Sequence, residues 1–293
     1  MSDQVQIAPA PLIPEAPPQQ IAECVWVFTD HRINLVPNIG VVVGDTAALV
    51  VDTGMGRRNG ERLLERVREL TDKPLLLTLT HFHPEHGWGA QAFAGAAVIV
   101  YNRVQREELE EKFGPFVELF SSFGPEIAEL LADVELVRPH IVYEDAAELD
   151  LGGVTVQLSY HEPAHTRGDQ LILLPSERVL FAGDLVENRF FPILPDEDAH
   201  GSKWIALLER MQALEPAIVV PGHGEVGGAA LIEEVRAYLD YVRSRVEESR
   251  SGGMSLEDAK RELEPEIRSR YESWDNEIWI GFAIESFYRE RSG

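Results

Sequence analysis

The stretch from Thr80 to Gly89 carries three histidines and one glutamate within six positions, His81-Phe82-His83-Pro84-Glu85-His86. The leucine-rich residues before it, 73–80, are typical of a short buried strand. If the strand extends to His83, both imidazoles point to the same side, because side chains alternate along a strand. Neutral imidazole and carboxylate are ligands for zinc, iron or manganese. The stretch therefore predicts part of a metal centre at a strand end, a common place for sites in layered α/β folds.

A metal centre needs ligands from other parts of the chain, because a histidine cluster alone does not complete it. Three further predicted strands each end near one candidate ligand, and these are His165, Asp184 and His223. Apolar runs at 24–28, 40–43 and 47–51 precede an amphipathic helix at 61–70. This order predicts a mixed sheet with helices outside it. Four strand ends at one sheet edge would bring all the ligands together.

In chain order, four segments resemble the metallo-β-lactamase-fold superfamily, namely His81–His86, His165–Asp169, Gly183-Asp184 and Pro221–Gly224. The resemblance covers about residues 22–226. It implies an α/β architecture, an αβ/βα four-layer sandwich, with two zinc ions at the sheet edge and with iron or manganese as alternatives. Carried over by position, one ion would take His81, His83 and His165, and the other would take Glu85, His86 and His223. Asp184 would bridge the two ions.

Two positions distinguish this chain within that resemblance. Glu85 stands where the family usually has aspartate, and its carboxylate reaches about 1.5 Å further from the backbone, one carbon–carbon bond. Asp184 stands where β-lactamases of the superfamily tend to have cysteine or serine, whereas its thioesterases, lactonases, phosphodiesterases and nucleases have aspartate. Antibiotic hydrolysis is therefore expected only as a weak side activity.

The ligand set predicts hydrolysis, with Glu85 and Asp184 as the catalytic carboxylates. A bound metal lowers the pKa of its water to about 7 and polarises a carbonyl or phosphoryl oxygen. The sequence contains no Gly-x-Ser-x-Gly motif that would indicate a serine nucleophile. Asp52, which ends a predicted strand, is either a turn former or a second carboxylate behind a ligand, and Asp169 is a candidate for the same supporting role.

Four aromatic residues lie next to the ligands in sequence and are candidates for substrate contact, namely Phe82, Trp88, Phe190 and Phe191. Such side chains suit a small, partly apolar substrate with an ester, thioester, lactone or amide bond. The alternative for each of them is packing in the core. Two other functions stay open: an iron-dependent oxidoreductase with the same ligands, and a metal-binding sensor or partner-binding protein with little turnover. No flavodoxin module or rubredoxin cysteines are recognisable, which disfavours the oxidoreductase.

The net charge argues against nucleic acid and membrane surfaces as partners. Lysine and arginine number 26 against 50 acidic residues, which gives −24, and this charge repels phosphate backbones. The single cysteine, Cys24, excludes an intrachain disulfide framework. No apolar run reaches the roughly 18 residues of a membrane span, and no lysine or arginine precedes Arg32, unlike the start of a signal peptide. We expect a cytoplasmic protein that acts on a small molecule.

Three segments lie outside the predicted strand-rich core of residues 21–230. Residues 1–20 are rich in proline, which predicts an extended or disordered arm or a strap onto a partner subunit. Residues 103–133 predict a helical insertion, divided at Gly114-Pro115, that either packs on the core or forms a cap or dimer surface. Residues 231–293 predict a helical C-terminal extension that covers the sandwich or contributes to a homodimer.

Overall fold

The computed structural model describes residues 10–161, 163–195 and 198–290. The first of its two sheets follows the order β1-β2-β3-β4-β5-β6-β7, antiparallel from β1 to β4 and parallel from β4 to β7. Its strands are β1 (Gln19–Ala22), β2 (Val25–Phe28), β3 (Ile39–Val43), β4 (Ala48–Val51), β5 (Leu75–Thr78), β6 (Ala97–Asn102) and β7 (Ile141–Tyr143).

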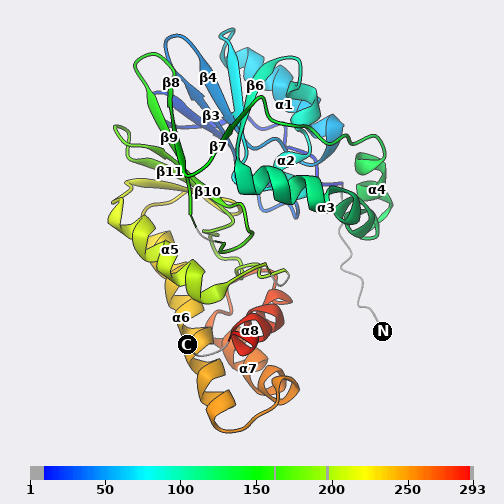
Figure 1. Cartoon of the computed structure of the whole chain (residues 1–293), viewed down its shortest axis with the longest axis vertical. Coiled ribbons are helices and arrows are strands. Elements are labelled where there is room, and N and C mark those ends of the chain that lie inside the picture. Colours follow the sequence, from blue (N-terminus) through cyan, green and yellow to red (C-terminus); the bar gives the residue numbers. More distant parts are fainter. Residues whose placement is uncertain (1–9, 162, 196–197, 291–293) are drawn as a thin grey trace.

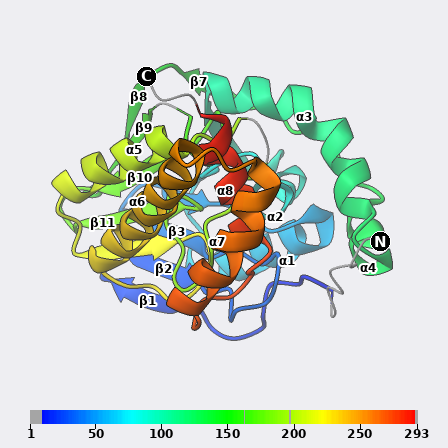
Figure 2. The same ribbon diagram turned by 90° about the horizontal axis from the view of Figure 1, so that it is seen from below.

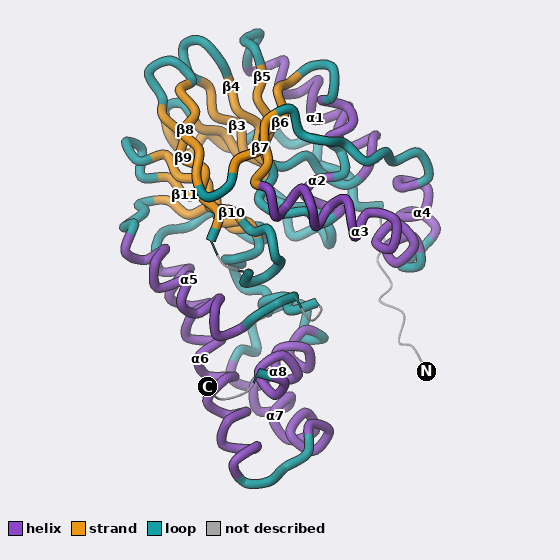
Figure 3. Tube along the Cα trace, in the orientation of Figure 1, coloured by secondary structure: helices purple, strands orange, loops and turns teal. Residues whose placement is uncertain are grey.

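The second sheet follows the order β12-β11-β10-β9-β8, in which only the β11–β12 pair is parallel. Its strands are β8 (Ala146–Asp150), β9 (Thr155–Tyr160), β10 (Gln170–Leu174), β11 (Val179–Gly183) and β12 (Ile218–Pro221). The two sheets pack face to face, with helices on their outer faces (Figure 1, Figure 3). This arrangement confirms the predicted αβ/βα sandwich.

The alternation of apolar side chains in β4 shows how the layers are held together. Ala48 and Val50 point to the helices outside the first sheet, whereas Leu49 and Val51 point to the second sheet. Because strand side chains alternate between faces, a strand that is apolar at every position is buried on both sides. The outer face of the first sheet packs on α1 (Gly56–Leu70), and that of the second packs on α5 (Gly201–Ala213) and α6 (Ala230–Ser251).

The described part of the N-terminal arm is ordered, so the prediction of a disordered arm is wrong for residues 10–20. The side chain of Ile13 is buried, and its N–H donates to Asn59 Oδ1 at 2.9 Å. Asn59 Nδ2 in turn donates to the carbonyl of Pro11 at 2.8 Å. One apolar anchor and one amide from α1 thus hold the arm, and local composition does not reveal such contacts. Residues 1–9 lie outside the described residues.

The insertion contains α3 (Arg103–Ser121) and α4 (Pro125–Leu131). The predicted break at Gly114-Pro115 is wrong, because α3 continues through Pro115. Leu109 and Phe120, on either side of the proline, pack in the same apolar cluster, which outweighs the loss of one helical hydrogen bond. Figure 2 shows that α3 bends along its length, the usual effect of a proline inside a helix.

The C-terminal helices α6, α7 (Leu256–Arg270) and α8 (Trp279–Arg289) gather beyond α5 (Figure 1). They share an apolar cluster with α5 that includes Trp204, Tyr238 and Ile284. Ser255 caps α7 by accepting a hydrogen bond from the N–H of Asp258 at 3.2 Å. None of the helices in the described residues is long and apolar enough to cross a membrane.

Candidate metal centre

The candidate ligands follow four strands, as the sequence predicts, but these strands belong to both sheets, so the prediction of a single sheet edge is wrong. His81 and His83 follow β5, and Glu85 and His86 lie on the short helix α2 (Pro84–Gly87) that continues the same segment. The other three ligands follow β9, β11 and β12 and are His165, Asp184 and His223. All seven side chains are buried. The topology therefore brings together every ligand that the sequence proposes.

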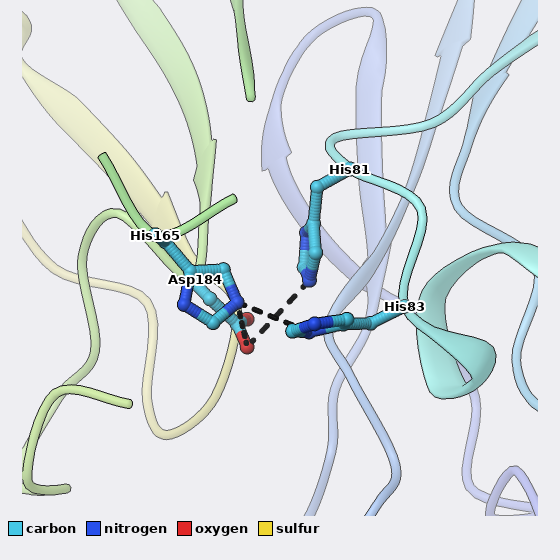
Figure 4. A group of neighbouring side chains, drawn as sticks. All are labelled: His81, His83, His165 and Asp184. Carbon is cyan, nitrogen blue, oxygen red and sulfur yellow. Dashed lines mark hydrogen bonds and ion pairs between the residues drawn. The ribbon is translucent and has the colours of Figure 1, made fainter. Parts of the chain in front are cut away.

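The first group consists of His81, His83, His165 and Asp184, whose ligand atoms lie within 4.8 Å of one another (Figure 4). His83 Nδ1 lies 3.1 Å from His165 Nε2. Two nitrogens bound to one tetrahedral zinc ion at about 2.05 Å would lie about 3.3 Å apart. The spacing of these two imidazoles therefore fits ligands of a shared ion.

The second group consists of Glu85, His86, Asp184 and His223, again with ligand atoms within 4.8 Å of one another. Asp184 belongs to both groups, with one carboxylate oxygen turned to each. Its Oδ1 lies 3.1 Å from His86 Nε2 and 3.7 Å from His223 Nε2. Its Oδ2 lies 3.6 Å from His165 Nε2 and 3.9 Å from His81 Nε2. Asp184 thus has the position of a carboxylate between two cation sites.

Several buried ligand atoms have no hydrogen-bond partner among the described residues, namely His81 Nε2, Glu85 Oε2 and Asp184 Oδ2, whereas His86 Nε2 and Asp184 Oδ1 face each other at 3.1 Å. Buried polar atoms in folded proteins almost always have a partner. Unpaired atoms that converge on two points are what a metal centre requires, and the donor set of imidazole and carboxylate matches zinc, iron or manganese. The residues therefore fit metal ions at both groups.

The electrostatics of the cluster also suit cation binding. Burial lowers the pKa of His81 and of His83 well below the usual value, so both imidazoles are neutral and have a free lone pair. Burial opposes ionisation of Asp184, yet His86, His223 and His81 hold its pKa well below the usual value. Burial also opposes charge on His86, but the carboxylates of Asp184 and Asp52 raise its pKa well above the usual value. A metal ion at His86 must therefore displace a proton.

The imidazoles are oriented by hydrogen bonds on their far nitrogens. Asp52 Oδ2 lies 2.8 Å from His86 Nδ1. His165 Nδ1 lies 2.7 Å from the carbonyl of Ile193, and His223 Nδ1 lies 3.0 Å from the carbonyl of Val36. An acceptor at Nδ1 keeps the proton there and leaves Nε2 free for a metal. The contact with His86 favours the supporting role for Asp52.

Asp169 supports the site in a different way from the predicted one. Its Oδ2 accepts hydrogen bonds from the main-chain N–H groups of His165 and Thr166 at 2.8 and 2.9 Å, and its Oδ1 accepts one from Thr166 Oγ1 at 2.5 Å. The prediction that Asp169 orients an imidazole is therefore wrong. The segment turns back after His165, which directs the carboxylate to main-chain donors of its own loop.

Close packing holds Asp184 in place. A Cβ atom added at Gly222 would overlap Asp184 Oδ1. The N–H of Gly222 also donates to the carbonyl of Gly183 at 2.9 Å, which joins the segment before His223 to the segment before Asp184. Glycine at 222 therefore lets two strand ends approach closely enough to share one centre.

The four aromatic candidates for substrate contact are all buried. Phe82 lies 4.8 Å from the ring of His83, and Trp88 Nε1 donates to the carbonyl of Phe82 at 3.2 Å. Phe190 lies 6.0 Å from His223. Phe191 instead packs on Tyr238 and Trp274 among the C-terminal helices. Their contact with a substrate stays a prediction, and Phe191 lies among core residues.

Two residues near the centre are not among the predicted site residues: Phe116 belongs to the insertion that was expected to pack on the core or form a cap, and Glu187 was missed. Phe116 of α3 stacks on His83, with ring centroids 5.8 Å apart. Glu187 is buried, and neither of its oxygens has a partner among the described residues. Burial, together with the charges of Asp184 and Glu85, raises the pKa of Glu187 well above the usual value. A signal for Glu187 was its place three residues after Asp184 on the same loop.

Comparisons with known proteins agree with this geometry. A model of the metallo-beta-lactamase superfamily matches residues 33–223. A linear primary-alkylsulfatase from Pseudomonas sp. is 25% identical over 224 residues, which cover 64% of this chain and 41% of the relative. The chain thus spans less than half of that relative's length. A type 2 metallo-beta-lactamase from Bacteroides fragilis is 27% identical over 216 residues, which cover 72% of this chain and 78% of the relative.

Solved structures show the same fold. A metallo-beta-lactamase from Pontibacter korlensis superposes with a TM-score of 0.63 at 21% identity, covering 76% of this chain and 98% of that chain. The DIM-1 metallo-beta-lactamase superposes with a TM-score of 0.62 at 21% identity, covering 78% of this chain and 98% of that chain. The family model matches more than half of the chain and includes all seven ligand candidates, and the chain therefore belongs to the metallo-beta-lactamase superfamily.

Proposed function

We propose that this protein is a zinc-dependent hydrolase with two metal ions that cleaves an ester, thioester, lactone or amide bond of a small, partly apolar substrate. The observation that carries the proposal is the position of Asp184, whose two oxygens face the two groups of ligands. A carboxylate between two cation sites is typical of hydrolytic centres with paired metals.

The protein residues divide the work between them. His81, His83 and His165 would hold one ion, and Glu85, His86 and His223 the other, with Asp184 shared. The bound ions would supply a Lewis acid and lower the pKa of a water molecule. Glu85 is buried, and burial raises the pKa of its carboxyl. We propose that Glu85 either binds the second ion or accepts a proton at its unpaired Oε2.

The substrate class rests on the walls of the site and on the charge of the chain. Phe82 and Phe190 lie beside ligands, which suits an apolar group. The net charge of −24 supports a small molecule rather than a nucleic acid. The single cysteine supports a cytoplasmic enzyme, because no intrachain disulfide is needed. The names of the relatives add a sulfate ester and a β-lactam to the bonds worth testing.

The ligand atoms also support a second candidate, an iron-dependent oxidoreductase. Both groups offer only nitrogen and oxygen ligands, and such sets bind iron as well as zinc. Metal analysis of the purified protein separates the two candidates. Stoichiometric zinc supports the hydrolase, and stoichiometric iron with oxygen consumption supports the oxidoreductase.

The test is a screen of chromogenic esters, thioesters, lactones, anilides, a sulfate ester and a β-lactam. The protein as purified, the chelator-treated protein and the Asp184→Asn variant are measured side by side. We expect turnover of at least one carboxylic substrate, loss of that turnover on chelation and its return with added zinc. Turnover that persists without metal, or in Asp184→Asn with intact metal content, would contradict the proposal.

A further inference from the structure

A stripe of apolar side chains on α3 begins at the metal centre. Phe116 stacks on the imidazole of His83. The ring of Phe120 lies 5.9 Å from that of Phe116, and the ring of Phe123 lies 5.0 Å from that of Phe120. Leu119 adds a fourth member, since residues 116, 119 and 120 have the spacing of one helix face, and Phe123 follows in the turn just after α3. We call these four residues the α3 stripe.

The stripe is only partly covered by the rest of the chain. Leu119 is 48% exposed and Phe123 is 37% exposed, and both are among the large apolar side chains that the described structure leaves open to solvent. Phe120 packs into the core cluster beneath them and fixes the face in place. Adjacent exposed apolar residues that continue into a site mark a place for a ligand or a partner.

The least buried ligands show where the centre opens. His83 is 5% exposed and His223 is 7% exposed, whereas His86 and His165 are fully buried. Phe116 stands beside His83, and Phe190 stands beside His223. A substrate that reaches the ions from this edge meets an aromatic ring on each side. One of these rings, Phe116, is the first member of the α3 stripe.

Charge narrows the class of ligand. Glu118 is exposed on α3 near the stripe, and Glu111 is exposed but forms an ion pair with Arg167 at 2.5 Å. The cation in this part of the helix, Lys112, lies 3.1 Å from Glu108 and 2.6 Å from Asp198, so acidic groups balance it. An anionic tail or an anionic membrane surface would be repelled. An uncharged hydrocarbon chain meets no such penalty.

We propose that the α3 stripe binds the uncharged acyl or alkyl chain of the substrate while the bond to be cleaved lies at the metal centre. This inference rests on the proposed hydrolase function and specifies its substrate. Residues 116 to 123, of which the last two follow α3 in a turn, span at most about 10 Å at 1.5 Å per helical residue, which corresponds to a chain of up to about eight carbons. The structure therefore favours medium-chain esters over acetates.

The experiment measures kcat/KM for p-nitrophenyl esters from acetate to dodecanoate. We expect kcat/KM to rise about two- to fourfold per added methylene up to about eight carbons and then to level off. In the double variant Leu119→Ser and Phe123→Ser, the ratio of octanoate to acetate should fall at least tenfold. The matched control is Ile278→Ser with Phe282→Ser, which changes two residues of the exposed apolar face at α8, 53% and 40% exposed, and should keep the ratio.

A binding measurement tests the stripe independently of turnover. Metal-free protein is mixed with the neutral dye Nile red, and 1-octanol is added to displace it. The Leu119→Ser and Phe123→Ser variant should lose most of the octanol-displaceable signal, whereas the α8 control should keep it. If only the α8 variant loses the octanol-displaceable signal, the chain binds at α8 and not at the α3 stripe, and the inference is wrong. A dimer that dissociates only in the α3 variant would also overturn it, by showing a second copy on the stripe.

The two proposals fail in different ways. If no ester is cleaved but octanol still displaces the dye from the α3 stripe, the hydrolase function is wrong and the binding face stands. If esters are cleaved at rates independent of chain length and octanol displaces nothing, the function stands and the stripe does not bind substrate.

Discussion

Asp52 Oδ2 lies 2.8 Å from Nδ1 of His86, while Asp52 Oδ1 accepts a hydrogen bond from the N–H of Thr80 at 2.7 Å. The buried carboxylate of Asp52, just after β4, thus holds both Thr80 and His86, the two ends of the segment that carries the first candidate ligands. Asp52 has a φ of 69°, a left-handed conformation that aspartate and asparagine adopt more readily than most residues. The contact fixes the tautomer of His86 and the path of the backbone at once.

The first prediction concerns Asp52→Asn. An asparagine oxygen can accept from Thr80, but its NH₂ group cannot accept from His86 Nδ1–H. The imidazole would then carry its proton on Nε2, which faces Asp184. We expect metal affinity of the second group to fall about 10- to 100-fold, the usual effect of losing such a contact, with the fold retained.

The measurement is a competitive zinc titration of wild type, Asp52→Asn and the control Asp45→Asn, which alters an exposed residue in the β3–β4 turn. The control should titrate like wild type. Equal affinities in all three proteins would show that Asp52 acts only on the backbone.

The second prediction concerns Asp184→Asn. A neutral amide cannot balance two adjacent cations, and its NH₂ group would face one set of imidazoles. We expect less than one bound metal per chain and loss of most turnover, with a circular dichroism spectrum like that of wild type. Elemental analysis and rate are measured on the same sample. Two bound metals with full activity would refute the shared role of Asp184.

The sequence placed each candidate ligand just after a predicted strand, and the structure keeps each of them there. It did not predict that these strands belong to two sheets, with His81 after β5 of the first sheet and Asp184 and His223 after β11 and β12 of the second. The resemblance to a family added the pairing of these ligands into two groups. The same pairing appears in the geometry, where Asp184 turns one oxygen to each group of candidate ligands, and metal binding by the two groups stays a prediction.

The parts that were missed depend on contacts between distant segments. Ile13 is held by Asn59, 46 residues away, and composition alone marks its proline-rich surroundings as disordered. Pro115 is tolerated in α3 because Leu109 and Phe120 pack in one cluster. Glu187 looks like an ordinary polar loop residue until the fold buries it. In each case tertiary packing overrides the local pattern.

The third prediction concerns Glu85→Ala. The carboxylate of Glu85 belongs to the second group of ligands and is absent from the first. We therefore expect titration to show one tight site in the variant and two unequal sites in wild type. The rate should fall about 10²-fold or more. The control is Glu129→Ala, which alters an exposed residue of α4. If Glu85→Ala keeps two tight metal sites and normal turnover, Glu85 is neither a metal ligand nor a proton acceptor.

The fourth prediction concerns the pH dependence of stability in the metal-free protein. Burial raises the pKa of Asp169 to about 7, against the hydrogen bonds from Thr166 and His165, whereas an unfolded aspartate titrates near about 3.9. The folded state therefore binds the proton more tightly than the unfolded state. This contribution to stability is complete below about pH 4 and is lost as the pH rises to about 7.

Asp169→Asn mimics the protonated carboxyl, so the variant should not lose this stability as the pH rises. We expect urea unfolding of the two metal-free proteins to give similar free energies at pH 4. At pH 8 the variant should be the more stable, by at most about 4 kcal/mol. If the free energies of unfolding of wild type and variant change in parallel from pH 4 to pH 8, Asp169 is ionised at all these pH values in the folded protein.

The last prediction concerns Gly222→Ala. The added methyl group would overlap Asp184 Oδ1, the oxygen that faces the second group. Either the Asp184 side chain rotates or the segment before His223 moves away, and both changes separate the ligands of the second group. We expect the second metal to be lost first and the rate to fall about as far as in Glu85→Ala, while the first group keeps its ion.

The matched control for Gly222→Ala is Gly95→Ala, where an added methyl group meets no atom within 4 Å. Both variants receive the same methyl group, so a difference between them reports the contact with Asp184 and not the general cost of replacing glycine. Metal content and thermal unfolding are measured with and without zinc. If zinc raises the unfolding temperature of Gly222→Ala as much as that of Gly95→Ala, the close approach of Gly222 does not hold Asp184 in place.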